Sequence, residues 1–306
     1  MRAGVLYSVA AYVLWALFPL YFTFLARSGA LEIIGYRVIC SLIFCLLIMV
    51  AVGGWGDIRK LLSSRRTSLA LVAAGVLVSI NWTAYVIGVN SGRILDAALG
   101  YFINPLVAAA LGVLVLRETM SRVQWVAFAL GAAACVILAI GYGKVPWIAF
   151  AVAGTFGLYS LVKKKVGATV PALAGLTIET ATVAPLMIVY LLWLSLSGGA
   201  TVDVASPYGL LVLAAGPVTA IPLLLFAAGA RRVRLVTLGM IQYIAPIGQF
   251  LLGWLAFNEP MPPERWAGFV LVWVAVALFV GSAVWRYRAQ QSAKRAAGVT
   301  RASHGS

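Results

Sequence analysis

Charged residues are scarce in this chain. Of its 306 residues, only 10% are Asp, Glu, Lys or Arg, whereas 63% are hydrophobic. A typical soluble domain has about 25% charged residues. A soluble fold could not bury this much apolar surface, so we expect lipid to surround most of the chain. The composition therefore predicts an integral membrane protein.

Residues that commonly carry enzyme chemistry are also nearly absent. The single histidine, His304, lies in the polar C-terminal segment, which leaves the apolar part without the commonest catalytic base and metal ligand. The cysteines Cys40, Cys45 and Cys135 lie in apolar runs without CxxC spacing, as expected of small core residues. The sequence contains neither a GxxxxGK phosphate loop nor GxSxG. We therefore expect no enzyme, no ATP-driven pump, no catalytic residue, no metal and no cofactor.

Long apolar runs dominate the chain instead. A helix needs about 20 apolar residues to cross the hydrocarbon core of a bilayer. Ten such runs occur, at about 4–26, 30–52, 69–90, 94–116, 122–142, 146–163, 172–197, 208–230, 234–257 and 264–285. The sequence thus predicts an all-α membrane protein with ten transmembrane helices. It also predicts a disordered tail over 286–306, which has almost nothing to bury.

The 23 Lys and Arg residues are distributed unevenly between these runs. If the N-terminus is cytoplasmic, 18 of them fall on the inside, Arg37 lies within a run, and only Arg27, Arg93, Lys144 and Arg265 fall outside. Short basic loops stay preferentially in the cytoplasm. We therefore expect both termini to be cytoplasmic. The net charge of +15 follows from this arrangement and does not indicate binding to nucleic acid.

The two halves of the chain are related by an offset of 141 residues. It superimposes Gly75 on Gly216, Arg93 on Arg234, Pro105 on Pro246, Gly112 on Gly253, Glu118 on Glu259 and Trp125 on Trp266. Each half has five predicted helices, so the second half would enter the membrane from the opposite side. Inverted repeats are a recurring plan of secondary transporters, with the substrate site near the midplane. The sequence therefore predicts one repeat over 1–143 and a second over 144–285.

Short motifs occur in a fixed order between about residues 3 and 285. They are AYVLWALFPLYF (11–22), EIIGYR (32–37), INW (80–82), LGYFINPL (99–106), YSLVKKK (159–165), IET (178–180) and RLVTLGMIQYIAP (234–246). This set resembles the RarD group of EamA-type transporters, in the drug/metabolite transporter superfamily. The resemblance implies two inverted EamA repeats around a central cavity, with efflux or exchange of small metabolites across the bacterial inner (cell) membrane.

Two positions depart from the pattern of that group. Tyr36 stands where the group usually has histidine, so a histidine proton relay cannot be carried over to this chain. Asp96 stands where the group usually has glutamate, which keeps the charge on a shorter side chain.

Arg37 is the one basic residue inside an apolar run. A charge at this depth costs several kcal/mol unless something compensates it. An offset of 142 places Glu179 opposite Arg37, and their levels differ by about 8 Å at a rise of 1.5 Å per residue. Three interpretations stay open: a direct ion pair, two groups on either side of a substrate cavity, and a structural pair that joins the repeats.

Further lining candidates are polar or aromatic residues set in apolar helices. They are Trp15, Asn81, Trp82, Tyr85, Tyr101, Asn104, Tyr159, Gln242 and Tyr243. Most aromatic residues in membrane helices serve packing or interface anchoring, and that simpler interpretation stands beside the functional one.

Together these features favour a secondary active transporter, an exporter or exchanger of small organic metabolites or drugs, including amino-acid-like compounds or aromatic amphiphiles. Arg37 would bind an anionic group of the substrate, and Glu179 or Asp96 would carry a proton. A lipid translocase or a non-transport membrane scaffold is the alternative. The expected partners are a small-molecule substrate and membrane lipids, and a homodimer stays an open option.

Overall fold

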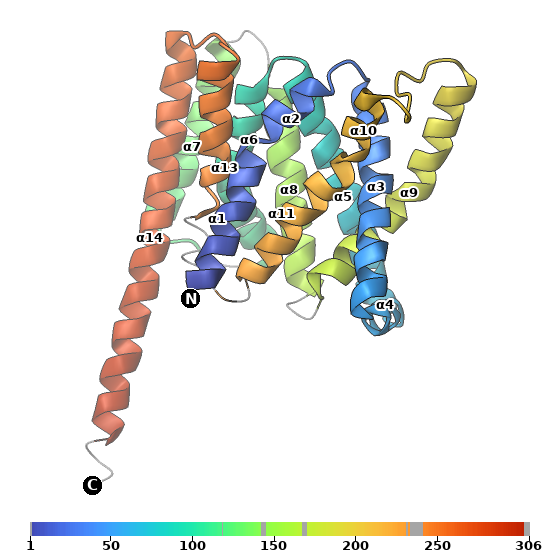
Figure 1. The fold of residues 1–306 in the computed structure, drawn as a ribbon. Coiled ribbons are helices and arrows are strands. Elements are labelled where there is room, and N and C mark those ends of the chain that lie inside the picture. The colour runs from blue at the N-terminus through green and yellow to red at the C-terminus, as the bar shows by residue number, and fades with distance from the viewer. Residues whose placement is uncertain are drawn as a thin grey trace.

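The computed structural model describes residues 2–117, 119–141, 145–166, 170–230, 232 and 241–302. Every regular element among these residues is helical (Figure 1). The α-helices are α1 (Arg2–Ala16), α2 (Phe18–Phe24), α3 (Ala30–Val52), α4 (Trp55–Leu62), α5 (Arg65–Asn90), α6 (Ile94–Leu116), α7 (Arg122–Gly141), α8 (Trp147–Val166), α9 (Ala172–Leu196), α10 (Pro207–Leu213), α11 (Ala215–Ala230), α13 (Ile244–Leu251) and α14 (Pro263–Ala302), and η1 (Leu252–Ala256) is a π-helix. Glu118, Arg234 and His304 lie outside the described residues.

Within the described part, seven helical segments are long and apolar enough to cross a membrane. They are Ala3–Phe24, Ala30–Val52, Arg65–Asn90, Ile94–Val115, Ala172–Leu196, Pro207–Phe226 and Pro263–Ser282. Three shorter apolar helices, Arg122–Leu138, Trp147–Lys163 and Ile244–Ala256, fall within the three remaining predicted runs, 122–142, 146–163 and 234–257, and residues 234–240 of the last run lie outside the described residues. The chain is thus an all-helical, multi-pass membrane protein. That these three shorter helices also cross, giving ten in total, stays a prediction.

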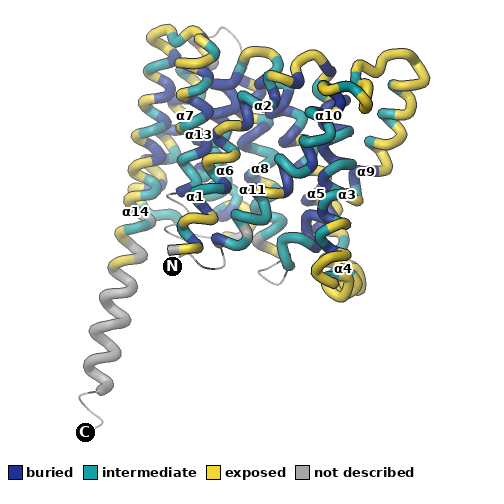
Figure 2. Tube along the Cα trace, viewed as in Figure 1, coloured by how far each residue is buried: buried dark blue, intermediate teal, exposed yellow. Residues whose placement is uncertain are grey.

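The distribution of buried and exposed residues fits a membrane environment. Apolar side chains on the outer faces of the helices are exposed, for example Leu114 at 78% and Leu186 at 65%, because in a membrane they would contact lipid. The buried positions concentrate between the helices (Figure 2). One core cluster includes Phe22, Trp82 and Tyr85. It lies at the same depth in the bundle as Arg37.

Two glycines permit close crossings between helices of the two sequence halves. A Cβ on Gly75 of α5 would lie 2.5 Å from the carbonyl oxygen of Glu179 on α9. A Cβ on Gly216 of α11 would lie 2.5 Å from the backbone of Cys40 on α3. Small residues allow such backbone contact between membrane helices. These glycines are the pair that the 141-residue offset superimposes, which agrees with the repeat, although the repeat itself stays a prediction.

The C-terminal segment differs from the sequence-based expectation. α14 continues to Ala302, past the predicted end of the last apolar run at residue 285, and extends away from the bundle (Figure 1). A helix satisfies its backbone hydrogen bonds internally, and Ala, Arg, Gln and Lys after Trp285 have high helix propensity. A segment with few apolar residues therefore has little to pack against the helix bundle, but it can still form a helix. The sequence predicts a disordered tail over 286–306, whereas the structure is helical from 286 to 302, and 303–306 lie outside the described residues.

Candidate functional site

Arg37 lies on α3 with only 2% of its surface exposed, and aromatic rings surround it. Its guanidinium carbon is 4.3 Å from the ring centroid of Trp82, 5.0 Å from that of Phe22 and 5.6 Å from that of Phe18. Cation–π contacts of this kind contribute about 2 kcal/mol where water is excluded. We call these three rings the aromatic cage. The cage therefore supplies much of the compensation that a buried arginine needs.

A residue from the second half of the chain accepts a hydrogen bond from the same guanidinium group. Arg37 Nε donates a hydrogen bond of 2.8 Å to Thr219 Oγ1 on α11. Arg37 Nη1 is buried and has no hydrogen-bond partner among the described residues. An unsatisfied buried donor is costly, and a carboxylate, phosphate or carbonyl oxygen would satisfy it. The arrangement can thus accept an anionic or carbonyl group.

Four of the predicted lining residues, from α5 and α6, meet beside the cage. Trp82 belongs to it directly. The ring of Tyr85 lies 6.0 Å from Phe22 and 5.9 Å from Tyr101, and its buried hydroxyl has no partner within the described chain. Tyr101 Oη donates to Asn81 Oδ1 at 3.2 Å. The structure thus connects these four residues by contacts next to Arg37, and that they line a substrate site stays a prediction.

Trp15 contacts the second half of the chain through its backbone carbonyl as well as its ring. Pro19 lacks an N–H group, so the carbonyl of Trp15, four residues earlier, has no helical partner. Gln249 Nε2 on α13 donates to that carbonyl at 3.0 Å. The half-buried ring of Trp15 lies 5.8 Å from the ring of Phe226. The break between α1 and α2 thus provides a contact between the two halves.

Three other predicted residues lie along α6 and the turn before α13. Asn104 Oδ1 and Tyr243 Oη are buried without a partner in the described part of the chain. Tyr243 packs against the cluster that contains Phe102 and Phe250. Gln242 is half-buried in the same turn. Their participation in a substrate site stays a prediction.

Glu179 is paired with a residue that the sequence analysis did not select. Lys163 Nζ donates to Glu179 Oε1 at 2.5 Å, and Tyr159 Oη donates to Glu179 Oε2 at 3.1 Å. Lys163 belongs to a basic cluster that looked like part of a cytoplasmic loop. However, α8 continues to Val166, so its long side chain can reach back while 32% of it stays exposed. Among the described residues, Arg37 and Glu179 have separate partners: the aromatic cage surrounds Arg37, and Lys163 pairs with Glu179.

Asp96 lies in the first turn of α6, at the end of the bundle opposite the N-terminus. Its Oδ2 is 2.5 Å from Arg93 Nη2, and its Oδ1 is 3.4 Å from Arg265 Nη2 on α14. Glu259, from the connection between η1 and α14, approaches the same turn and lies 3.7 Å from Arg265 Nη1. Asp96 therefore belongs to a charged cluster at one end of the bundle and not to the cage.

Glu32 also has a structural role at that end. It is buried, and its Oε1 accepts hydrogen bonds from the backbone N–H groups of Thr201 at 2.9 Å and Val202 at 3.2 Å. Thr201 Oγ1 donates to Glu32 Oε2 at 2.7 Å. Glu32 thus joins the start of α3 to the connection after α9, and does not compensate Arg37.

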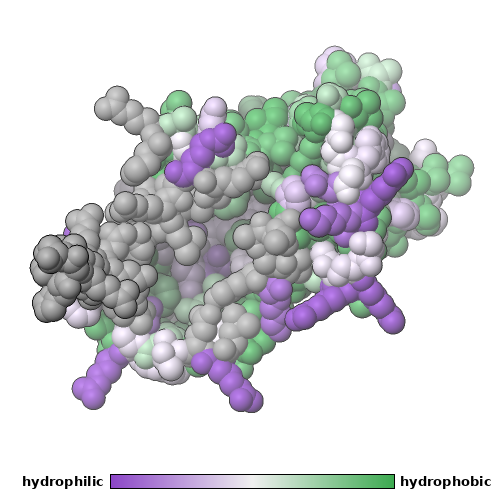
Figure 3. All heavy atoms as spheres, turned by 90° about the horizontal axis from the view of Figure 1, so that it is seen from below, coloured by the Kyte–Doolittle hydropathy of each residue, from purple (hydrophilic) through white to green (hydrophobic). Residues whose placement is uncertain are grey.

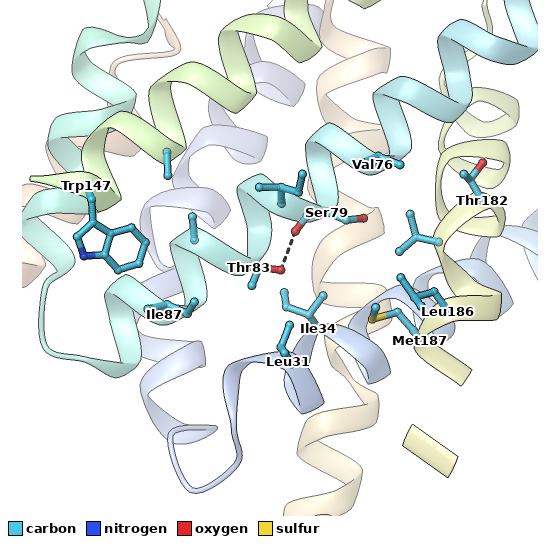
Figure 4. A pocket seen from close by; sticks show the side chains of 14 residues that line it. Leu31, Ile34, Val76, Ser79, Thr83, Ile87, Trp147, Thr182, Leu186 and Met187 are labelled. Carbon is cyan, nitrogen blue, oxygen red and sulfur yellow. Dashed lines mark hydrogen bonds between the residues drawn. The ribbon is translucent and has the colours of Figure 1, made fainter. Parts of the chain in front are cut away.

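A groove of about 460 Å³ lies between α3, α5, α8 and α9 (Figure 4). Its lining is almost entirely apolar and includes Ile34, Val76, Trp147 and Leu186. The hydroxyl of Thr83, one of its few polar groups, already donates to the carbonyl of Ser79 at 2.8 Å. The groove shares no residue with the predicted site, and its surface suits an acyl chain or another apolar body.

Comparison with known proteins identifies relatives along almost the whole chain. Residues 2–140 match the EamA-like transporter family. Protein RarD of Streptomyces exfoliatus is 45% identical over 98% of this chain and 95% of its own length, and the uncharacterized transporter YojE of Bacillus subtilis is 40% identical over 95% and 98%. A solved crystal structure with 17% identity aligns over 91% of this chain and 97% of its own, with a TM-score of 0.61, which supports the fold. The chain therefore belongs to the EamA-like transporters of the drug/metabolite transporter superfamily, among the RarD relatives.

Proposed function

We propose that this protein is a secondary active transporter that exports or exchanges small organic metabolites or drugs by alternating access. Arg37 is the binding group for an anionic or carbonyl oxygen of the substrate. Phe18, Phe22 and Trp82, with Tyr85 and Tyr101 beside them, accommodate an apolar or aromatic body. Amino-acid-like compounds and aromatic amphiphiles combine both features.

The observation that carries this proposal is the buried hydrogen-bond donor of Arg37 that has no protein acceptor among the described residues. Nη1 has no partner among the described residues, although its neighbour Nε is bonded to Thr219. A purely structural arginine would be expected to have its buried donors satisfied by the protein. The group also lies where helices of the two sequence halves meet, which is where inverted-repeat transporters bind their substrates.

Counterflow in proteoliposomes tests the proposal. We expect accumulation of a labelled compound that has a carboxylate next to an aromatic or aliphatic body. The matched neutral amide should exchange at least ~10-fold more slowly, because it loses a charge-assisted hydrogen bond. Equal exchange of the acid, the amide and a cationic analogue would contradict the assignment of Arg37, and exchange of no compound across a broad panel would contradict transport.

The orientation of the protein is part of the proposal. The exposed basic residues Arg59, Lys60, Arg65, Arg66, Arg122, Lys165 and Arg232 belong to connections or helix ends. Hydrophilic side chains project around the lower face of the molecule, the side on which α1 begins (Figure 3). Basic segments are retained in the cytoplasm. We therefore place this face in the cytoplasm of a bacterium, and we call the opposite end the outer end.

A reporter fusion tests this orientation. Alkaline phosphatase fused after Arg288 is expected to be inactive, because it folds only outside the cytoplasm, whereas a cytoplasmic fluorescent protein at the same site should be fluorescent. A phosphatase fused after Gly199, between α9 and α10, is the matched control and should be active. The opposite pattern would overturn the topology and with it the inverted repeat.

Lipid translocation, or a scaffold role without transport, is the alternative. The groove between α3, α5, α8 and α9 could contact an acyl chain, but its described lining contains no charged residue that would accompany a lipid head group. A scaffold would not require the unsatisfied Arg37 donor. Transport of soluble substrates is therefore the function that the site supports best.

A further inference from the structure

Glu259 caps a helix from which it is separated by about half of the chain. Its Oε1 accepts a 2.5 Å hydrogen bond from the backbone N–H of Ile94, and Oε2 accepts one of 3.2 Å from Leu95. The first N–H groups of a helix lack intrahelical partners, and a negative charge there is stabilised by the helix dipole. We call this contact between Glu259 and the start of α6 the outer clamp.

The surrounding backbone fixes the side chain of Glu259 in this position. The N–H of Glu259 donates to the carbonyl of Gly253 in η1 at 2.9 Å. Asn258, just before it, has a positive φ of 50° and turns the chain towards α6. A Cβ on Gly253 would lie 3.0 Å from the side chain of Leu95, so η1 and α6 are in close contact at this glycine.

Charged neighbours from each packed element face the clamp. Arg93 precedes α6, Asp96 lies in its first turn, and Arg265 lies in the first turn of α14. Arg265 bridges the two sides, because it contacts both Asp96 and Glu259 and donates to the carbonyl of Pro260 at 2.8 Å. The carboxylate of Glu259 is therefore the central acceptor that joins α6 to the connection between η1 and α14.

α6 extends from the clamp to the cage region. Tyr101 lies seven residues after Ile94, or about 10 Å along the helix axis. Its hydroxyl bonds to Asn81, and its ring lies beside Tyr85, next to the cage around Arg37. A displacement of the outer end of α6 would therefore move residues that contact the substrate in the proposed function.

We propose that Glu259 is a positioning residue for transport: its carboxyl group holds the outer end of α6 against the second half and closes the outer end of the pathway. This inference rests on the proposed alternating access. For the cage to open outwards, the clamp must break, and Glu259 must exchange its backbone donors for water.

The clamp should respond to pH, and the sign follows from the burial of Glu259. Burial is the main cause that raises the pKa of Glu259 to about 7, and the charge of Asp96 acts in the same direction. Hydrogen bonds from Leu95 and Ile94 and the charge of Arg93 oppose this shift. In the open state water would surround the carboxyl group and return its pKa towards the ordinary 4.5. The closed state thus binds the proton more tightly, so closure is increasingly favoured as the pH falls from about 7 towards 4.5, and this contribution is lost as the pH rises through 7.

Thiol labelling tests the clamp without any substrate. Ala97 is fully buried one turn into α6, so Ala97→Cys in a background without Cys40, Cys45 and Cys135 reports access from outside. A membrane-impermeant maleimide is applied to cells, and the labelling rate is divided by that of an exposed Ala200→Cys reference at the same pH. Glu259→Ala should raise this ratio about 10-fold or more, because the backbone N–H groups at the start of α6 lose their side-chain acceptor. Glu264→Ala is the matched control, since Glu264 is an exposed glutamate in the first turn of α14, and should leave the ratio unchanged.

A second variant keeps the test informative if Glu259→Ala does not fold. Glu259→Gln retains an acceptor oxygen but cannot ionise. The ratio for the parent protein should rise between pH 6 and pH 8.5, while the ratio for Glu259→Gln should stay constant and low. Unchanged labelling in Glu259→Ala, or the same pH response in the parent and Glu259→Gln, would overturn the clamp. A functional clamp in a protein without counterflow would instead contradict the proposed function alone.

Discussion

Arg37→Ala is expected to abolish counterflow and leave membrane insertion intact. The substitution removes the cation that the cage surrounds, and a lost charge-assisted hydrogen bond of about 1.5–3 kcal/mol corresponds to at least ~10-fold in substrate affinity. Folding should survive, because alanine leaves an aromatic pocket and Thr219 can bond within its own helix. The measurement is initial counterflow with equal amounts of protein in the liposomes.

Two further variants separate binding from structure at this position. Arg37→Lys retains the charge but loses the planar donors of the guanidinium, so partial activity is expected. Arg27→Ala is the control, because Arg27 is an exposed arginine whose guanidinium carbon lies 5.3 Å from the ring of Tyr208. It should transport normally. If Arg37→Ala transports at the rate of the parent, Arg37 is structural and the site assignment is wrong.

The second large effect is expected at the pair of Glu179 and Lys163. If protons drive transport, Glu179→Gln should remove the dependence on a pH gradient but keep part of the exchange at equal pH, since Gln resembles the protonated acid. Lys163 can remain charged in this variant because a third of its side chain is exposed. Lys163→Met should be more harmful, because it leaves a carboxylate buried without its cation.

The double variant Lys163→Met with Glu179→Gln distinguishes coupling from simple loss of stability. It contains neither charge, so exchange at equal pH should recover towards the level of Glu179→Gln. Asp96→Asn should affect the pH dependence less, since Asp96 already pairs with Arg93 and Arg265 away from the cage. Full pH-driven uptake in Glu179→Gln, together with its loss in Asp96→Asn, would move the proton site to the start of α6. No change in either variant would indicate an exchanger without proton coupling.

The sequence was informative where local patterns decide the structure. Apolar runs of about 20 residues predicted the membrane helices, because crossing a bilayer imposes a length. Arg37 was recognisable because a charge in an apolar run is costly. Asn81, Trp82, Tyr85 and Tyr101 are recognisable as polar or aromatic residues in apolar helices. Trp82 contacts Arg37, Tyr85 contacts Phe22 of the cage, and Tyr101 and Asn81 follow through contacts with Tyr85 and with each other.

The same patterns do not show which residues of different helices contact each other. Sequence periodicity identifies the faces of a helix but not the element that each face contacts. Lys163 ends the predicted run 146–163 and counts among the basic residues on the inside, so the sequence did not indicate its contact with Glu179. The fold brings Glu259 to the N-terminus of α6, about 165 residues away in the chain, and no local pattern indicates that partner. Glu32, the nearest acid to Arg37 in sequence, bonds to Thr201 and Val202 instead.

The lack of an acidic partner for Arg37 among the described residues also has an electrical consequence. Glu179 and Lys163 neutralise each other, so the empty cage carries one uncompensated positive charge, whereas a cage that holds a monoanion is neutral. Moving one elementary charge through the full membrane potential changes the free energy by about 2.3 kcal/mol per 100 mV. With the cytoplasm negative, the voltage would act on the return of the empty carrier and favour the inward-facing state. Transport of an anion would then be electrogenic, even though the loaded carrier itself is insensitive to voltage.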